Sequence, residues 1–469
     1  MIRATTLALL AALTPDARAD DFDVRVGVAV EDITPPVGMR VGGNYTSPIS
    51  TGVHDPLLAK AIVFEQNGER AAIVVCDLTG VALSVTGPAR ASASQQTGIP
   101  AANIIISATH THGAPQYAGP IRDLEHADAI ARTGKDSHEP IDYQAFVADR
   151  CARAVVRAKA ALRPSTLSVT MADQPGLAFN RRFHMKNGTV RFNPGKKNPE
   201  IVRVAGPVDT SLPILMIRDE KESKPRALFV SFAIHVATYG GLAFGADFPM
   251  HLQEGLRKEF GPEFVSVFGE GTAGDINHID VADARPQTSD VEPSRIGAAI
   301  TKTVIGAVPA LKAVETPSLA VRSTTVKLPL QSVTDEAVAR ALDVYRRKVS
   351  PTPDFYLLVE SHRRLEIRDR RKEFGLSEPA EVQAIRLGSD TAIVSLPHEV
   401  FVEIGMAIKA ASPFKNTFVI SLAEDADFYV PTRRAFAEGS YEVDTCPLQP
   451  GCGEALVEAA VALLKGLKP

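Results

Sequence analysis

The sequence predicts an α/β (α+β) fold: a single large domain of catalytic size around a mixed β-sheet with flanking helices, with its site at the strand ends. Short apolar segments rich in Val and Ile alternate with longer segments that carry apolar residues at helical spacing. This alternation is typical of sheets covered by helices. The 469 residues contain no long low-complexity linker and no internal repeat, so we expect one domain rather than several modules.

The first half of the chain predicts two paired strands followed by helices. Residues 59–80 predict two strands joined by a tight turn at an Asn-Gly pair, the residues that such turns favour. The segment 84–98 predicts a helix that leads into a strand over 103–107. Residues 143–162 carry apolar side chains at helical spacing, so they predict a second helix that packs on the sheet.

The second half repeats this plan. A final helix is predicted over residues 454–467. The charge-rich segment 363–374 predicts an amphipathic helix with a solvated face. The polar segment 121–142 is interpreted as an insertion or lid near the histidines, with an inert surface excursion as the alternative. Apolar strand-like segments run over 212–219, 226–235, 264–271, 390–399 and 417–425.

Composition excludes two classes of partner. Lys and Arg number 51 against 55 Asp and Glu, for a formal net charge of −4, and no basic run stands out. Nucleic acid is therefore not an expected partner. No stretch after the N-terminus reaches the length of about 18 apolar residues that a membrane-spanning helix needs. Contact with a membrane surface stays open.

The N-terminus predicts export. A positive charge, a short apolar run and a small-x-small site ending at Ala19 form a signal peptide over 1–19. We expect an exported, periplasmic or secreted mature chain over 20–469; a ragged cytoplasmic N-terminus is the alternative. Of the four cysteines, Cys446 and Cys452 flank a turn-forming loop and could close a disulfide in an exported protein.

The segment NIIISATHTHGAP, residues 103–115, places His110 and His112 at the end of a predicted strand. Residues two apart in an extended chain point to the same side. His235 ends another apolar strand, although a hydrogen-bonded core histidine is the alternative there. Glu399 follows a third strand, and Tyr429 a fourth. His and Glu donors suit zinc better than magnesium or calcium.

Other catalytic motifs are missing from the sequence. No GxSxG nucleophile elbow occurs, and the segment GEGTAG lacks the Lys-Ser/Thr that a phosphate-binding loop needs. Serine hydrolase and nucleotide-binding functions are therefore not expected.

The chain resembles the neutral/alkaline non-lysosomal ceramidase family from GVAVEDITPPVG near residue 27 to EGSYE near residue 442. SATHTHG, SFAIHVAT, PHE and YVPT resemble the family's zinc motifs. The resemblance implies a neutral-ceramidase-like zinc hydrolase domain over 20–469, with one Zn²⁺ per chain and water attack on the amide of N-acylsphingosines. The metal ligands that it implies are His110, His235, Glu399 and Tyr429.

The resemblance also implies residues around the scissile carbonyl. His112 and Tyr441 are the implied pocket residues, NRR implies Arg181 as a pocket arginine, and AGD implies Asp275 as the start of a family hexapeptide. That hexapeptide reads GDINHI here, with Asn277 where the family has its serine. Asn277 can donate a hydrogen bond but cannot act as a nucleophile. The chain also ends after this domain, so we expect a divergent bacterial-type member without the C-terminal immunoglobulin-like domain.

These departures leave three functions open. The first is a zinc-dependent amidohydrolase of sphingolipid metabolism with a small-molecule or lipid-like N-acyl substrate. The second is a zinc-dependent deacylase, esterase or lyase that acts on a polar, saccharide-type substrate, which the charge-rich insertion favours. The third is a non-catalytic exported binding protein, for which only Asn277 speaks.

Overall fold

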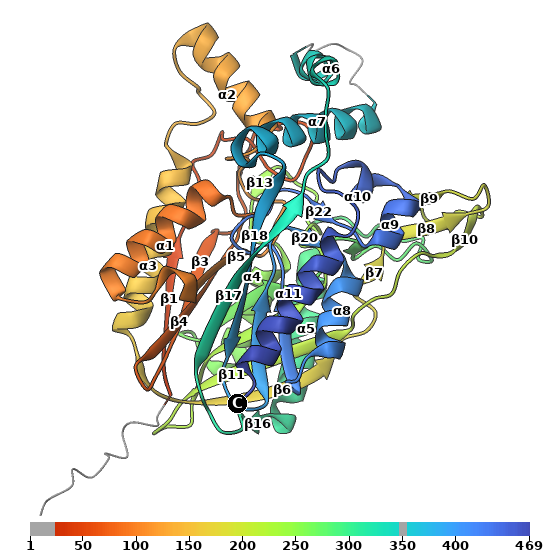
Figure 1. Ribbon diagram of the computed structural model, residues 1–469. Coiled ribbons are helices and arrows are strands. Elements are labelled where there is room, and N and C mark those ends of the chain that lie inside the picture. Colours follow the sequence, from red (N-terminus) through yellow and green to blue (C-terminus); the bar gives the residue numbers. More distant parts are fainter. Residues whose placement is uncertain (1–23, 347–353) are drawn as a thin grey trace, which may run out of the picture.

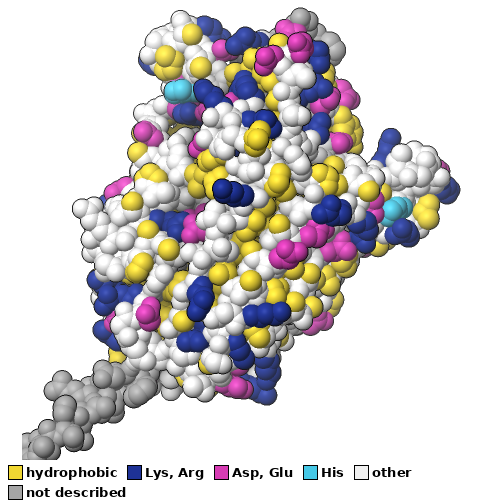
Figure 2. Space-filling view, in the orientation of Figure 1, with side chains coloured by type: hydrophobic (Ala, Val, Ile, Leu, Met, Phe, Trp, Pro, Cys, Tyr) yellow, Lys and Arg dark blue, Asp and Glu magenta, His cyan; other side chains and the backbone are white. Residues whose placement is uncertain are grey.

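The computed structural model describes residues 24–346 and 354–469 (Figure 1). The predicted signal peptide over 1–19 lies outside the described residues. Within the described residues, no helix has both the length and the apolar character to cross a bilayer. On the face seen in Figure 2, acidic and basic side chains are interspersed with hydrophobic ones.

A large mixed sheet forms one layer of the core, as the alternation of strands and helices in the sequence predicts. Its order is β14-β12-β11-β6-β1-β3-β4-β5, with β16 paired to β6. The β12–β14 and β4–β5 pairs are parallel and the others antiparallel. The strands are β1 (Arg25–Asp32), β3 (Leu58–Gln66), β4 (Glu69–Cys76), β5 (Ile104–Ala108), β6 (Arg163–Asp173), β11 (Ser211–Asp219), β12 (Pro225–Phe232), β14 (Val265–Glu270) and β16 (Lys312–Ala313).

A second, four-stranded sheet packs against the first. Its order is β17 (Ala320–Pro329), β18 (Ser377–Arg386), β19 (Thr391–Ser395) and β21 (Asn416–Ile420). One apolar cluster joins strands of both sheets, and the rings of Phe229 and Phe418 lie 5.8 Å apart across it. The sequence predicted one sheet. Continuous apolar strands cannot reveal how they divide between two sheets, because every face of them is buried.

Helices cover both outer faces, which gives four layers (Figure 1). The first sheet packs on α1 (Leu83–Thr97), α3 (Tyr143–Ala160), α4 (Phe248–Phe260) and α5 (Glu292–Ala307). The second packs on α8 (Val402–Ala411) and α11 (Cys452–Leu467). The predicted helices over 84–98, 143–162 and 454–467 are confirmed to within two residues at each end. The Asp142 carboxylate caps α3 by accepting from the Ala145 amide at 3.0 Å.

Three helices lie beyond the carboxyl ends of the strands: α2 (Pro120–Thr133), α6 (Asp335–Arg346) and α7 (Phe355–Phe374), at the top of Figure 1. The predicted insertion over 121–142 therefore begins as α2, near the histidines. The helix predicted over 363–374 is confirmed as part of α7 and exposes Lys372 and Glu373, but it also buries two charged residues, Glu366 and Arg370. Their burial depends on acidic and arginine partners from distant segments, which helical periodicity does not show.

All four cysteines are buried and free. The disulfide considered between Cys446 and Cys452 is not formed in the structure. Cys76 of β4 and Cys151 of α3 face each other with their Sγ atoms 3.3 Å apart, so they pack as small apolar residues in the core.

Candidate metal centre

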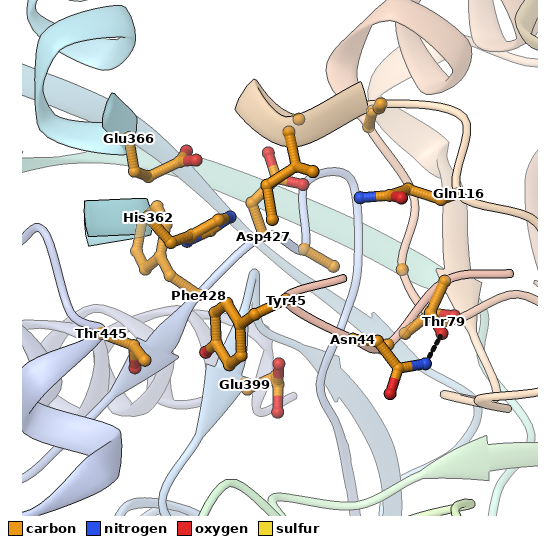
Figure 3. Close-up of a pocket in the computed structure, with 18 of the residues that line it drawn as sticks. Asn44, Tyr45, Thr79, Gln116, His362, Glu366, Glu399, Asp427, Phe428 and Thr445 are labelled. Carbon is orange, nitrogen blue, oxygen red and sulfur yellow. Dashed lines mark hydrogen bonds between the residues drawn. The ribbon is translucent and has the colours of Figure 1, made fainter. Parts of the chain in front are cut away.

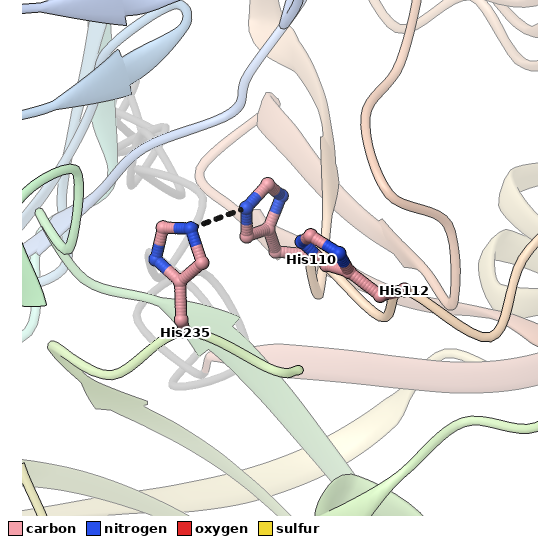
Figure 4. A group of neighbouring side chains, drawn as sticks. All are labelled: His110, His112 and His235. Atoms are coloured by element: carbon pink, nitrogen blue, oxygen red, sulfur yellow. Dashed lines mark hydrogen bonds between the residues drawn. The ribbon is translucent and has the colours of Figure 1, made fainter. Parts of the chain in front are cut away.

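Three histidines form a buried cluster where strands from distant parts of the chain end (Figure 4). His110 and His112 follow β5, and His235 follows β12. One nitrogen of each ring lies within 4.8 Å of the other two, and Nε2 of His110 is 3.1 Å from Nε2 of His235. The structure thus brings together the two histidines expected as ligands and the one expected in the pocket.

The strand periodicity used to place His110 and His112 on one side is wrong. The strand β5 ends at Ala108, and His110 has a left-handed φ of 71°. Its ring meets the His112 ring edge to face, with centroids 5.0 Å apart. The two histidines converge because the loop turns, and strained backbone of this kind is common where a site fixes a side chain.

Glu399 and Tyr429 complete the set of expected ligands. They are opposite residues of the parallel pair β20 (Glu399–Val400) and β22 (Tyr429–Val430). Glu399 Oε2 lies 3.2 Å from His110 Nε2 and 3.4 Å from His235 Nε2. The Tyr429 ring stacks on the His235 ring with centroids 6.4 Å apart. Three of the four expected ligands therefore bring their donor atoms within 3.4 Å of one another, and the Tyr429 ring lies beside them.

Backbone carbonyls fix the orientation of two rings. Nδ1 of His110 lies 2.6 Å from the Thr79 carbonyl, and Nδ1 of His235 lies 3.0 Å from the Ala273 carbonyl. A carbonyl only accepts, so each Nδ1 carries a hydrogen, and Nε2 presents a lone pair whenever its ring is uncharged. When both rings are uncharged, their Nε2 lone pairs and the Glu399 carboxylate therefore face one another. Such an arrangement favours a cation between them.

The electrostatics of the cluster differ from ring to ring. Burial opposes protonation of His110, but the Glu399 and Glu270 carboxylates outweigh it and raise the His110 pKa to about 9. Burial and the positive charge of His110 lower the pKa of His112 to about 3. At neutral pH His112 is therefore uncharged, and its buried Nε2 has no partner. The cluster therefore contains one imidazole that favours a positive charge, His110, and one that stays neutral, His112.

Arg181 lies beside the cluster, as expected for a pocket arginine. It follows β7 (Phe179–Asn180) and is buried. Its guanidinium donates to Glu442 Oε1 at 2.9 Å and to the Gly274 carbonyl at 2.7 Å, and Nη1 lies 3.1 Å from His235 Nε2. These partners hold the positively charged guanidinium next to the histidines. Burial is the main cause of the lowered pKa of His235, and the charge of Arg181 is the second.

The other expected residues have different surroundings. The Tyr441 hydroxyl lies 3.1 Å from that of Tyr45. Asn277 of β15 (Ile276–Asn277) is buried and donates to Asn193 Oδ1 at 3.0 Å. Asp275 accepts from the Val402 backbone amide at 2.8 Å and from the Asn180 side-chain amide at 2.7 Å, so both its oxygens have protein partners. Of these three, Tyr441 and Asn277 line cavities beside the histidines.

The cluster lies between two cavities that share Gly43, Asn44, Tyr45, His112, Tyr429 and Tyr441. We call the first one, with a volume of about 170 Å³, the acidic cavity. Besides residues of the cluster, its lining includes Asn44, Tyr45, Thr79, Gln116, His362, Glu366, Asp427, Phe428 and Thr445 (Figure 3). The second, about 360 Å³, we call the arginine cavity; it is lined by Arg181, Phe192, Asn193, Asn277, His278, Phe355 and Leu358.

The sequence prediction missed several residues of these cavities. Tyr45 contacts His362 edge to face at 5.3 Å between ring centroids, and Glu366 and Asp427 line the acidic cavity. None of them lies in a recognisable motif. Glu366 and His362 are four residues apart on α7, which places them on one face of the helix. This spacing was the only indication in the sequence that the two side chains lie close together.

Gly274 is a position where a side chain would disturb the centre. A Cβ built there would lie 2.4 Å from the Glu399 carbonyl oxygen. We expect Gly274→Ala to displace Glu399 and to weaken metal affinity by about 10–100-fold, as the loss of an orienting contact does. Metal titration measures this. Gly87→Ala, with nothing within 4 Å, is the control; equal affinity for both variants would contradict the assignment.

Two further groups of acidic and histidine side chains are close enough to hold an ion. Asp136 and Glu139 already bind Arg40, at 2.8 and 3.4 Å. In the other group, Glu378 and Asp425 bind Arg370, and His398 Nε2 lies 2.8 Å from Glu378. Arg40 and Arg370 therefore neutralise part of the carboxylate charge in these two groups.

Comparisons with known proteins relate part of the sequence, and the fold, to neutral ceramidases. Residues 24–241 match the family model described as neutral/alkaline non-lysosomal ceramidase, N-terminal. Over 220 residues the chain is 28% identical to the neutral ceramidase of Pseudomonas aeruginosa; this match covers 45% of the chain but 30% of that protein. The crystal structure of the same organism's neutral ceramidase shares the fold with a TM-score of 0.69 at 18% identity, covering 96% of this chain and 76% of that one.

A second solved structure, a ceramidase complexed with C2, gives a TM-score of 0.70 at 18% identity over 95% of this chain and 76% of that one. The four-layer fold and the histidine cluster at its strand ends define an α/β protein with a candidate metal centre. Within that class, residues 24–241 are similar to the N-terminal part of the neutral/alkaline non-lysosomal ceramidases.

Proposed function

We propose that this chain is a zinc-dependent hydrolase that cleaves an N-acyl amide bond. One observation carries the proposal: His110 Nε2, His235 Nε2 and Glu399 Oε2 are separated by 3.1, 3.2 and 3.4 Å. Ligands at the usual zinc distances in tetrahedral geometry are roughly 3.3 Å from one another. The three atoms thus have the spacing of one face of a zinc tetrahedron, and Tyr429 is the proposed fourth ligand.

The residues around this face have distinct proposed roles. Bound zinc would supply the Lewis acidity that activates water and polarises a carbonyl. His112, neutral because its pKa is about 3, can exchange a hydrogen bond with the substrate. Arg181 and Tyr441 supply donors beside the cluster, and such donors stabilise charge that develops on a carbonyl oxygen. Asn277 contributes a hydrogen-bonding amide and no nucleophile.

The substrate and location are part of the same proposal. The family relationship supports a small-molecule or lipid-like N-acyl substrate, and the N-terminal 19 residues support export. Fractionation of cells that produce the protein, with N-terminal sequencing, tests the second point. An uncleaved chain confined to the cytoplasm would contradict it.

The proposed activity is tested by removing and restoring the metal. We expect purified protein to contain about one zinc per chain and to hydrolyse at least one member of a panel of N-acyl amides. Dialysis against a chelator should abolish turnover because the activating charge is lost, and zinc, but not magnesium, should restore it. Undiminished turnover by metal-free protein would contradict the mechanism.

A further inference from the structure

The chain between β12 and α4 contacts the other histidine-bearing segment of the metal centre at two points. Residues 236–247 of this stretch are called the connecting loop here. At its start, the Val236 carbonyl accepts from the His112 amide at 3.1 Å. Near its end, the Gly245 carbonyl accepts from the Thr111 hydroxyl at 2.7 Å. The position of His112 therefore depends on how both ends of the connecting loop are held.

The buried side chain of Asp247 ties the two ends of the connecting loop together. Its Oδ2 accepts from the amides of Thr238 and Tyr239 at 2.8 and 3.0 Å. Its Oδ1 accepts from the Thr238 hydroxyl at 2.5 Å and from the Phe248 amide at 2.6 Å. A carboxylate has about four acceptor positions, whereas the amide of asparagine has a single acceptor oxygen. The four donors around Asp247 therefore match a carboxylate and not an amide.

The backbone of Asp247 has a conformation that is otherwise almost restricted to glycine, with φ 60° and ψ −151°. Asp142, which caps α3, has an extended backbone with φ −72° and ψ 91°. Capping a helix therefore does not require the strained conformation. Strain of this kind persists only where the surroundings fix it, and it is concentrated at functional sites. The strain at Asp247 indicates a role beyond the cap of α4.

We propose that Asp247 is a positioning residue of the metal centre. The connecting loop begins directly after His235, a proposed ligand, and Asp247 holds it three and four residues further on. Through the Val236 carbonyl the same loop places His112, which we assign to the substrate. Asp247 thus orients a ligand and a substrate-binding ring together without contacting the metal. This role deepens the proposed zinc-dependent hydrolysis and rests on it.

Zinc affinity tests this role without using turnover. Asp247→Gly removes all four acceptors and relieves the backbone strain, because glycine adopts positive φ freely. We expect its zinc Kd, measured by competition with a chromophoric chelator, to rise about 10–100-fold, as it does when an orienting partner is lost. At saturating zinc its kcat should stay about tenfold below wild type, because His112 is displaced as well. Thr238→Val keeps the shape but removes one of the four donors, so its zinc Kd should rise about threefold.

The matched control is Asp142→Gly, which removes the cap of α3 and lines neither cavity. Both glycine variants should melt at a lower temperature than wild type, but only Asp247→Gly should lose zinc affinity. Wild-type zinc affinity in folded Asp247→Gly would overturn the assignment. If that variant does not fold, Thr238→Val decides, and an unchanged zinc Kd would then overturn it.

The wild-type protein separates this role from the proposed function. Zinc binding by the wild type without hydrolysis of any N-acyl amide would refute the proposed function, and the zinc affinities of the variants would still decide the role of Asp247. A wild-type protein without affinity for zinc would refute both.

Discussion

His110→Ala and His235→Ala should each remove most of the bound zinc and lower turnover about 1,000-fold or more. Each substitution deletes one of the two Nε2 atoms that face Glu399, and metal-ion catalysis supplies several kcal/mol of transition-state stabilisation. Elemental analysis gives zinc per chain, and the N-acyl amide panel gives turnover. The two measurements together separate loss of metal from loss of fold.

The control for this experiment is a histidine outside the cluster. His251 of α4 lies 3.7 Å from Glu254 and is partly exposed, so His251→Ala should retain zinc and activity. His112→Ala should retain zinc but lose turnover, because we assign this neutral ring to the substrate. Full zinc content in both ligand variants would show that the metal assignment is wrong. Loss of zinc in His112→Ala would make this residue a ligand, which its position in the cluster also allows.

Arg370→Met should lower the free energy of unfolding by about 3–5 kcal/mol, the usual cost of leaving buried charges without their partner. Arg370 is 6% exposed and serves Glu366, Glu378, Asp425 and Asp427. Methionine keeps much of the volume but removes the charge. Chemical denaturation gives the change in free energy.

The loss in Arg370→Met should also depend on pH. Burial already raises the pKa of Glu366, and Arg370 opposes that rise, so its removal raises the Glu366 pKa further. A carboxyl group with a raised folded-state pKa stabilises the fold below its unfolded pKa of about 4, and this contribution is lost as the pH rises through the folded-state value. The variant should therefore be closest to wild type at pH 5 and furthest from it at pH 8.

Arg368→Met provides the comparison on the same helix. Arg368 pairs with Asp369 at 2.7 Å, and both side chains are partly exposed. Exposed pairs contribute at most about 1 kcal/mol, so this variant should change stability little at either pH. A similar loss for Arg368→Met and Arg370→Met would contradict the buried network as the source of the effect.

The sequence predicted the elements of the fold better than their assembly. The turn at Asn67-Gly68 joins β3 and β4 as expected, and the helix from Tyr143 begins as expected. Local chemistry decides both, since the Asn-Gly pair adopts positive φ and Asp142 caps a helix. Apolar strand composition gave no information about two sheets, because burial on both faces looks the same in either arrangement.

For the candidate metal centre, too, the sequence predicted the residues better than their arrangement. The positions of His110, His235, Glu399 and Tyr429 after apolar strands, together with the family resemblance, indicated residues that the structure brings together. The geometric reason given for the first pair of histidines was wrong, since His110 takes a left-handed φ of 71°. A loop conformation depends on what packs around it, and here the Thr79 carbonyl holds the ring.

The amino-acid sequence by itself determined the alternation of strands and helices and the residues offered at the strand ends, because these follow from local periodicity and side-chain chemistry. Only the tertiary structure decided which carboxylates surround Arg370, and that the histidine cluster lies between two cavities. Glu366 on α7 and Asp427 beyond β21 are 61 positions apart in the chain. Charge acts over a few ångströms in space, whatever the separation along the sequence.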